Sequence, residues 1–484
     1  MIIKNRGVRI TVIKTITEEQ KAHQRKFIYK IKEENQRFLQ ENGRVRLANT
    51  ETYGCQQNEN DTERIRGILS ECGFEFTDNP EEADVVIYNT CAVRENAEQK
   101  VFGKIGILKH IKESRPEMII GLCGCMVQQE HITEKIKSIH RHIDLIFGTH
   151  ALWKMPELLY NAMNSKKTVV DIEDCDGYIA EDMPIKREND SKAWVSIMYG
   201  CNNFCTYCIV PYVRGRERSR EPENIISEIK ELVASGCTEI SLLGQNVNSY
   251  GKDLDRDIDF SKLLRMVNEI EGIRRIRFMT SHPKDFGDRL ILAMSECEKV
   301  CAQLHLPFQA GSDKVLSDMN RRYTKEDYLE KIRKVKEAIP NIALTTDVIV
   351  GFPTETTEDF EETLDVLRRV EFDSIFSFIY SRREGTPAAK LDFVLSDEEI
   401  HENFNRLLEV QNEISLKKNK ALLGKTELVL VDGVSKNNKG MLSGRTESLK
   451  VVNFKGDESL VGKYVNVKIT EAHTWSLNGK LCEE

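Results

Sequence analysis

Three cysteines stand close together in the stretch CNNFCTYC, at Cys201, Cys205 and Cys208. Cysteine thiolates bind zinc or iron–sulfur clusters. A structural zinc site takes four ligands, usually as two CxxC pairs, but the next cysteine along the chain is only Cys237. Three thiolates on a cubane cluster leave one iron without a protein ligand, and catalysis needs such an open metal position. The spacing therefore favours a catalytic iron–sulfur cluster over structural zinc.

A second set of cysteines is predicted by topology instead of spacing. Cys55, Cys91 and Cys125 each follow a strand-like segment, in RVRLANTETYGC, ADVVIYNTC and EMIIGLCGC. Sites in parallel sheets form beyond the carboxyl ends of the strands, so these three cysteines should open onto one rim. Six other cysteines have no partner pattern and should be buried as small apolar residues. They are Cys72, Cys175, Cys237, Cys297, Cys301 and Cys482.

Alternating strand-like and helical segments must position both sets of cysteines. From about residue 46 the alternation predicts a parallel sheet with helices on both faces. From about residue 192 six strand-like segments, separated by helices, predict a partial (β/α)6 barrel whose active site lies at the carboxyl ends of its strands. CNNFCTYC follows the first of these strands. The last stretch has short strands separated by Gly and Asn, which predicts a small antiparallel β-barrel.

These patterns divide the 484 residues into five parts. They are a charged leader without an assigned role (1–44), an α/β domain (45–164), an acidic linker (165–190), the (β/α)6 barrel (191–418) and the small barrel (419–484).

Composition limits the class of protein. Hydrophobic residues make up 40% of the chain and charged residues 31%, which is typical of a soluble globular protein. No apolar run approaches the roughly 18 residues of a membrane helix, and the N-terminus carries no secretory signal. We therefore expect a cytoplasmic protein without a membrane partner, whose clustered cysteines bind metal instead of forming disulfides.

The net charge of −8 gives no overall field that attracts nucleic acid, so RNA binding would need local basic patches. One candidate is the run Arg214, Arg216, Arg218 and Arg220, which could contact phosphates. Glu217 and Glu221 alternate with these arginines, so a salt-bridged barrel rim is the alternative.

CNNFCTYC resembles the CxxxCxxC signature of the radical S-adenosylmethionine enzymes. The resemblance implies that Cys201, Cys205 and Cys208 hold a [4Fe–4S] cluster whose open iron chelates S-adenosylmethionine. Reduction then yields a 5′-deoxyadenosyl radical, which takes a hydrogen atom from an unactivated carbon. The resemblance also suggests that Tyr207 packs near the adenine of the cofactor, with simple core packing as the alternative.

Further stretches resemble the methylthiotransferases within this superfamily, and among them the branch that acts on isopentenyl-adenosine. They are YGCQQNENDTE, NTCAVRENAEQKVFGKIG, GLCGCMVQQE, LHLPFQAGSDKVLSDMNRRYT, TDVIVGFPTETTEDFEETL and YSRREGTPAA. The resemblance spans about residues 46–480 and implies a methylthiotransferase domain, a radical barrel and a C-terminal TRAM domain. It places a second [4Fe–4S] cluster on Cys55, Cys91 and Cys125. Cys123 stands two residues before Cys125 and leaves open which of the two is the ligand.

The resemblance implies an activity. Carbon 2 of N6-isopentenyladenosine, next to the anticodon of a tRNA, is methylthiolated. S-adenosylmethionine serves both as methyl donor and as radical source. The partners implied are this tRNA, held in part by the TRAM domain, an external electron donor and a sulfur source, and nothing in the sequence demands more than a monomer.

Polar residues at other barrel strand ends are candidates for the cofactor pocket: Gln245, Gln309, Asp347 and Gly351. Each could equally stabilise the barrel. The nearest alternative functions are the sister methylthiotransferases, which act on threonylcarbamoyl-adenosine in tRNA or on an aspartate of a ribosomal protein. A more distant alternative is a non-catalytic iron–sulfur or zinc RNA-binding protein, which would not cleave S-adenosylmethionine.

Overall fold

The computed structural model describes residues 14–93, 95–172, 177–187, 190–436 and 438–482. The chain divides into two compact units. The first unit comprises residues 1–187, 199–202 and 210–220, and the second comprises 188–198, 203–209 and 221–484. Cys201 and the run that contains Arg214 therefore belong to the first unit, whereas Cys205 and Cys208 belong to the second.

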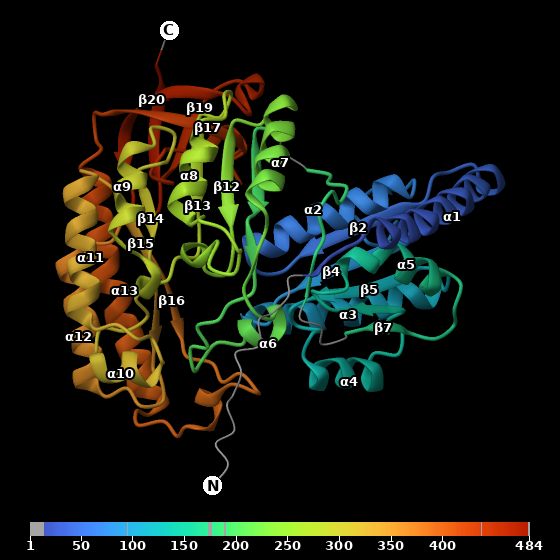
Figure 1. Ribbon diagram of the computed structural model, residues 1–484, viewed down its shortest axis with the longest axis horizontal. Helices are drawn as coiled ribbons and strands as arrows, with labels where there is room; N and C mark the ends of the chain where they lie inside the picture. Colours follow the sequence, from blue (N-terminus) through green and yellow to red (C-terminus); the bar gives the residue numbers. More distant parts are fainter. Residues whose placement is uncertain (1–13, 94, 173–176, 188–189, 437, 483–484) are drawn as a thin grey trace. The chain divides into compact units, whose positions relative to one another are not determined.

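A six-stranded parallel sheet forms the centre of the first unit, in the order β3-β2-β4-β5-β6-β7. Its strands are β2 (Leu47–Thr52), β3 (Glu75–Phe76), β4 (Val85–Thr90), β5 (Ile119–Gly124), β6 (Leu145–Phe147) and β7 (Val169–Asp171). The helices of this unit are α1 (Glu18–Asn42), α2 (Gln56–Glu71), α3 (Glu95–Ser114), α4 (Glu130–Ile139), α5 (Met155–Met163) and the short α6 (Val210–Arg214). The predicted parallel α/β domain is confirmed (Figure 1).

Side chains along β4 alternate between the two cores of this sheet. Val85 and Ile87 pack with side chains of α1, α2 and α5, whereas Val86 and Tyr88 pack with side chains of α3 and α4. Successive strand residues point to opposite faces, so a run that is apolar at every position belongs to a sheet covered on both sides. This burial of both faces leaves only the loops at the strand ends for a site.

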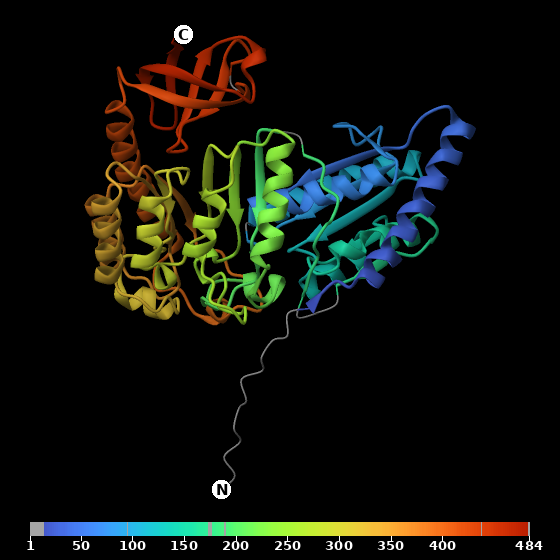
Figure 2. The same ribbon diagram turned by 45° about the horizontal axis from the view of Figure 1, so that its top comes forward.

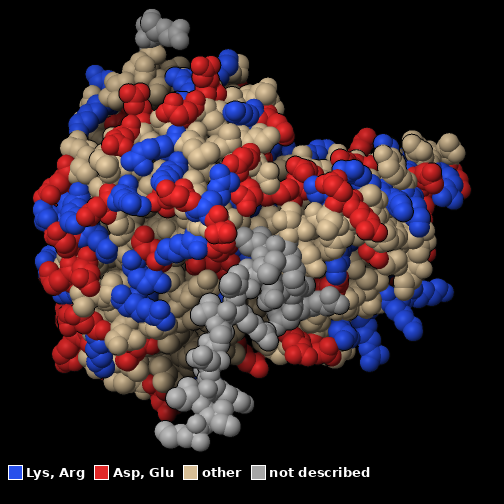
Figure 3. Space-filling view, in the orientation of Figure 1, with Lys and Arg blue, Asp and Glu red and all other residues tan. Residues whose placement is uncertain are grey.

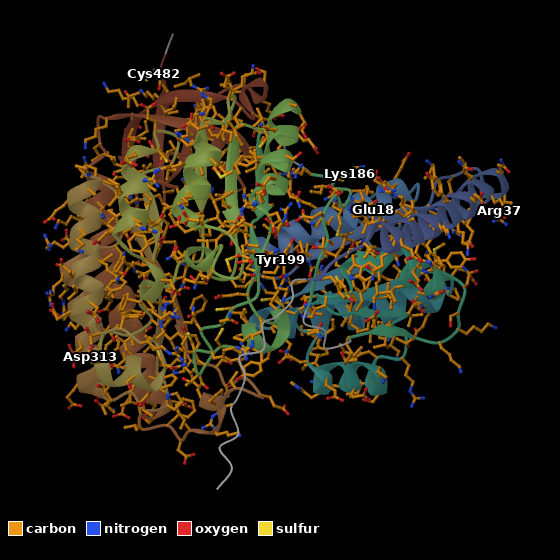
Figure 4. All side chains as sticks on the ribbon, viewed as in Figure 1. Glu18, Arg37, Lys186, Tyr199, Asp313 and Cys482 are labelled. Carbon is orange, nitrogen blue, oxygen red and sulfur yellow. The ribbon has the colours of Figure 1, made fainter. Side chains whose placement is uncertain are left out.

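The helix α1, which the sequence analysis left without a role, packs against α2 and α5 of the first unit. It begins with a capping box at Thr17 and ends at Gly43, whose φ of 67° suits glycine. Ile31 is fully buried on its packed face. Figure 4 labels Glu18 and Arg37, which lie toward its two ends.

The segment expected to be a linker also packs on the first unit where it is described. It supplies β7 at the sheet edge and β8 (Tyr178–Ile179), which pairs in parallel with β1 (Lys14–Thr15). Glu181 forms a buried ion pair with Arg220.

The second unit contains six strands in two parallel three-stranded sheets, in the orders β13-β12-β9 and β14-β15-β16. The strands are β9 (Lys192–Ser196), β12 (Glu239–Leu243), β13 (Arg275–Phe278), β14 (Gln303–His305), β15 (Ala343–Val350) and β16 (Ser374–Ile379). Two further two-residue strands, β10 (Met198–Tyr199) and β11 (Arg218–Ser219), lie near the cysteine stretch in sequence. The helices are α7 (Pro222–Ala234), α8 (Phe260–Asn268), α9 (Asp288–Glu296), α10 (Asp313–Asp318), α11 (Lys325–Ala338), α12 (Thr357–Val370) and α13 (Asp397–Lys420). The partial (β/α)6 barrel is confirmed.

The last strands form a closed five-stranded barrel in the order β17-β18-β19-β21-β20 (Figure 2). They are β17 (Thr426–Val434), β18 (Leu442–Arg445), β19 (Val451–Lys455), β20 (Tyr464–Ala472) and β21 (Leu477–Leu481). All its strand pairs are antiparallel except β19 with β21. Arg275 and Arg277 of β13 donate hydrogen bonds to backbone carbonyls of this barrel, which holds it against the first three-stranded sheet.

Within the described part of the chain, every helix is too short or too polar to cross a membrane.

Candidate functional site

The structure brings Cys55, Cys91 and Cys125 together at the carboxyl ends of β2, β4 and β5. Cys55 precedes the first residue of α2, Cys91 directly follows β4, and Cys125 directly follows β5. The sulfurs of Cys55 and Cys125 lie 3.9 and 4.0 Å from the same atom, Oδ1 of Asn58. Burial raises the pKa of the Cys125 thiol to about 12, and the neighbouring Cys91 and Cys55 thiols act in the same direction.

Gly54 leaves room for these thiols. Its φ is +134°, and a Cβ at this position would lie 2.6 Å from Cβ and 3.0 Å from Sγ of Cys91. Any side chain here would crowd the sulfur, so the close approach requires glycine. Asn58 fixes the neighbouring loops, because its Nδ2 donates to the carbonyl oxygens of Tyr53, at 3.0 Å, and Thr90, at 2.9 Å.

The side chain of Cys123 packs differently from the three grouped cysteines. It lies in β5 and packs in the hydrophobic core with Ala48, Leu145 and Phe147. Burial raises the pKa of its thiol well above the ordinary value. Cys125, two residues later, lies on the side of the other thiols, so the geometry favours Cys125 as the third member of the group.

Arg214 of α6 completes the surroundings of Cys125. Its Nε donates to Sγ of Cys125 at 3.1 Å, and its Nη2 donates to Oδ1 of Asn58 at 2.8 Å. The same Nη2 lies 2.8 Å from a carboxylate oxygen of Asp61. The side chain of Arg214 is only 7% exposed.

Arg214, Arg218 and Arg220 are all buried, which argues against the expected contact of these three side chains with RNA phosphates. Arg218 donates to the backbone carbonyls of Arg214 and Arg216. Arg216 is exposed, so for this residue the phosphate contact stays a prediction.

In the second unit, Cys205 and Cys208 lie in a loop that several hydrogen bonds hold in place. Thr206 donates its backbone N–H to Met319 at 3.1 Å and its hydroxyl to the Asp318 carbonyl at 2.8 Å. Asn320 donates to the carbonyl of Phe204 at 3.0 Å. Asn320 adopts a φ of 58° and Phe204 a φ of 48°, which are left-handed conformations uncommon outside glycine.

Cys205 has two basic neighbours in this unit. Nη1 of Arg321 lies 3.6 Å from its sulfur, and Nε2 of His282 lies 3.9 Å away. The Cys201 backbone N–H, in the first unit, donates to the Gly215 carbonyl at 3.1 Å.

Arg321 is 3% exposed and is surrounded by neutral groups. Its Nε donates to the Tyr323 hydroxyl at 3.1 Å, and its Nη2 donates to the Pro307 carbonyl at 2.6 Å. Nη1 lies 3.4 Å from the hydroxyl of Tyr207. Among the described residues, no Asp or Glu oxygen lies within 4.0 Å of this guanidinium.

The remaining candidates for the cofactor pocket differ in their surroundings. Tyr207 packs against a cluster that includes Phe352 and Tyr380, as the core-packing alternative expected, and its proximity to adenine stays a prediction. Gln245 is half-buried. Gln309 has a φ of 71°, and its backbone N–H and C=O pair with residues on β15.

Asp347 and Gly351 lie on and just after β15. A carboxylate oxygen of Asp347 lies 3.6 Å from Nε2 of His305. The N–H of Gly351 donates to the buried Glu355 at 2.5 Å, and a Cβ at Gly351 would lie 2.7 Å from Ile400. Packing against Ile400 therefore requires glycine at this position, and a role of Gly351 in the cofactor pocket stays a prediction.

The cysteines without a pattern follow the expectation in most cases. Cys72, Cys237, Cys297 and Cys301 are buried, and Cys482 is half-buried. Cys175 lies outside the described residues.

No three His, Cys, Asp or Glu side chains in the described ranges stand close enough to bind one metal ion.

Sequence reasoning missed Asn58, Asp61, His282 and Arg321. Asn58, Asp61 and Arg321 lie inside stretches that it singled out, YGCQQNENDTE and LHLPFQAGSDKVLSDMNRRYT, whereas His282 lies outside them. The contacts of Asn58 with Cys125, of His282 with Cys205 and of Arg321 with Cys205 join residues far apart in sequence, so local patterns could not reveal them.

Three family models match the chain. The Radical SAM superfamily matches residues 195–367, the uncharacterized protein family UPF0004 matches 48–148, and the TRAM domain matches 420–482.

Full-length relatives give the same assignment. The tRNA-2-methylthio-N(6)-dimethylallyladenosine synthase of Acetivibrio thermocellus is 57% identical over 466 residues, covering 96% of this chain and 97% of that protein. The synthase of the same name from Clostridioides difficile is 54% identical over 468 residues, covering 96% and 98%.

Among solved structures, the radical S-adenosylmethionine methyltransferase TsrM of Kitasatospora setae matches with a TM-score of 0.52 and 15% identity, covering 71% of this chain and 77% of that one. This match supports the fold alone. With the family models and the full-length relatives, it follows that the chain belongs to the tRNA-2-methylthio-N(6)-dimethylallyladenosine synthase family of the radical S-adenosylmethionine superfamily.

Proposed function

We propose that this protein methylthiolates carbon 2 of N6-isopentenyladenosine next to the anticodon of tRNA. The observation that carries the proposal is the presence of two separate cysteine groups, each with three members. Cys55, Cys91 and Cys125 form one group, and the stretch Cys201–Cys208 holds the other. The names and the near-complete coverage of the relatives support the same reaction.

Two [4Fe–4S] clusters and S-adenosylmethionine, when bound, supply a hydrogen-abstracting radical, a transferable sulfur and a methyl group. The net change on the substrate is the replacement of the C2–H bond by a C2–S bond whose sulfur carries the methyl group. Because each turnover consumes one sulfur atom and needs electrons, the enzyme also requires a sulfur source and an external electron donor.

The residues of the chain hold these groups and control their charge. In the first unit, Gly54 leaves space beside Cys91, and Asn58 orders the loops around Cys55 and Cys125. In the second unit, Arg321 and His282 flank Cys205. Hydrogen bonds to a ligating sulfur stabilise the thiolate form, which is the form that binds iron.

The TRAM domain gives the proposed tRNA a further contact surface. Trp475 of the small barrel is 60% exposed, and an exposed aromatic ring can stack on an unpaired base. On the face shown in Figure 3, basic and acidic side chains are intermixed, which supports shape-dependent recognition over tight non-specific binding.

We place this reaction in the cytoplasm, with the enzyme acting as a monomer.

The test is a reaction of the anaerobically reconstituted enzyme with S-adenosylmethionine, a chemical reductant and three substrates in parallel. These are tRNA carrying N6-isopentenyladenosine, tRNA carrying threonylcarbamoyl-adenosine, and ribosomal protein. Mass spectrometry of the digested products should find a methylthio group only on isopentenyl-adenosine.

Modification of either other substrate instead would assign the chain to a sister activity. Absence of 5′-deoxyadenosine with every substrate would leave the non-catalytic RNA-binding alternative.

A further inference from the structure

The side chain of Arg214, from the predicted phosphate-binding run, donates a hydrogen bond to the sulfur of Cys125. We propose that Arg214 is a positioning residue for the second cluster: it fixes the Cys125 ligand by a charge-assisted hydrogen bond and raises the reduction potential of that cluster. This inference rests on the proposed function, because it takes Cys55, Cys91 and Cys125 as the ligands of the second cluster.

The guanidinium is oriented by three acceptors at once. Nε points to Sγ of Cys125 at 3.1 Å, while Nη2 is held at 2.8 Å by both Asn58 and Asp61. The planar guanidinium presents its donors in a fixed geometry, so two strong acceptors on one nitrogen determine where the other nitrogen points. Asp61 and Asn58 thus aim Arg214 at the sulfur.

Stability alone is a poor reason for this arrangement. A buried ion pair costs desolvation that its Coulomb attraction barely repays, and apolar replacements are often at least as stable. A cation beside a sulfur ligand, in contrast, favours the more negative, reduced form of a cluster. Hydrogen bonds to ligand sulfurs and local charge are the known protein controls of iron–sulfur potentials.

Arg214 also connects the second cluster site to the first cysteine of the radical stretch. The residue that follows it, Gly215, accepts the backbone N–H of Cys201 at 3.1 Å. Gly200 packs against the same backbone, because a Cβ there would lie 2.6 Å from the Gly215 oxygen and 2.0 Å from the Arg216 oxygen. One peptide segment of the first unit therefore contacts both Cys125 and Cys201.

The test uses the Cys201→Ala/Cys205→Ala/Cys208→Ala variant, which retains only the second cluster. Arg214→Gln and Arg214→Lys are added to it, and the midpoint potential, the rate of iron loss to a chelator and the electron paramagnetic resonance spectrum are measured. We expect Arg214→Gln to shift the potential to more negative values and to speed iron loss about 10-fold or more. Arg214→Lys keeps the charge but loses the planar geometry, so it should fall between Gln and the parent.

Arg220 supplies the matched control. It lies six residues further along the same segment, is similarly buried, and forms an ion pair with the carboxylate of Glu181. Arg220→Gln should lower the melting temperature of the protein, but its midpoint potential should equal that of the parent variant.

Three results would overturn the inference. If Arg214→Gln keeps the potential and the iron retention of the parent, Arg214 serves only the fold. If Arg214→Gln and Arg220→Gln shift the potential equally, the effect is not specific to the sulfur contact. A parent variant that holds no iron would refute the second cluster itself, and with it the proposed function, before any change at Arg214.

Discussion

The two cysteine sites each contain a buried arginine beside a sulfur, but the two arginines are balanced differently. Arg214 in the first unit shares its charge with the carboxylate of Asp61. Arg321 in the second unit contacts two tyrosine hydroxyls and a carbonyl, with no carboxylate of the described residues within 4.0 Å.

The difference shows what each site requires from its occupant. An ion pair is already complete around Arg214, so this site is close to neutral before a cofactor binds. The charge of Arg321 is uncompensated by carboxylates, and an uncompensated buried charge is costly. An anionic occupant held by Cys205 therefore gains more from Arg321 than an occupant at Cys125 gains from Arg214.

Removing the carboxylate of Asp61 should abolish the difference in charge balance between Arg214 and Arg321. Asp61→Asn leaves Arg214 buried without its counter-charge, which typically costs about 3–5 kcal/mol of stability. Thermal unfolding of the variant should show a large loss in melting temperature. Glu181→Gln, which unpairs Arg220, is the control for a buried ion pair remote from sulfur.

Both variants should be destabilised, but only Asp61→Asn should also change the electron paramagnetic resonance signal of the second cluster. An unaltered signal would show that the Asp61–Arg214 pair has no influence on that site.

Arg321 should matter for S-adenosylmethionine cleavage. Replacing it by Met removes the donor to the Cys205 sulfur, and losing an outer partner of a metal ligand typically costs about 10–100-fold in metal affinity or activity. Formation of 5′-deoxyadenosine by the reduced enzyme is the measurement. Arg321→Lys should recover part of the rate.

Arg333→Met is the control, since Arg333 is an exposed residue of the same unit that pairs with Glu330 and Glu337. Equal rates for Arg321→Met and Arg333→Met would remove Arg321 from the account.

The comparison can be extended to a buried acid that is not paired with an arginine, the carboxyl group of Glu355. Glu355 accepts a hydrogen bond from the backbone of Gly351, and burial raises its pKa from 4.5 to about 8. Between these two pH values the unfolded chain has released a proton that the folded chain keeps. Stability should therefore fall as pH rises across this range, by at most about 1.4 kcal/mol per pH unit.

Glu355→Gln removes this dependence. It should raise the melting temperature at pH 8 relative to the parent and have little effect at pH 5. An equal shift at both pH values would mean that Glu355 ionises normally in the folded protein.

The smallest expected effect distinguishes Cys123 from Cys125 as the ligand of the second cluster. Cys123 packs in the core, so Cys123→Ala should cost about 1 kcal/mol as a small cavity and leave the iron content unchanged. Cys125→Ala should remove the second cluster. Loss of iron from Cys123→Ala instead would reverse the assignment.

Much of this site could be predicted from the sequence, because its cysteines obey two simple rules. Cys201, Cys205 and Cys208 follow a fixed spacing. Cys55 and Cys91 follow strand-like segments whose alternation with helices predicts a parallel sheet.

The arginines obey neither rule. Arg214 and Arg218 alternate with Glu217 as in an exposed charged face, and local pattern could not reveal that their side chains turn inward. Arg214 meets Asn58 across 156 residues of sequence, so this contact exists only once the sheet and α6 are in place. The same holds for Arg321 and Cys205, which are 116 residues apart.

The domain boundaries expected from the sequence stay predictions. The inclusion of residues 210–220 in the first unit could not be predicted from any local pattern.

The most direct test of two separate cluster sites is the iron and sulfide content of the anaerobically reconstituted protein. It should be measured with electron paramagnetic resonance for the parent and for the Cys201→Ala/Cys205→Ala/Cys208→Ala variant. Two clusters predict about eight irons per chain in the parent and about four in the variant, which keeps a spectrum of its own. About four irons in the parent and about none in the variant would contradict the account, and would return Cys55, Cys91 and Cys125 to a purely structural role.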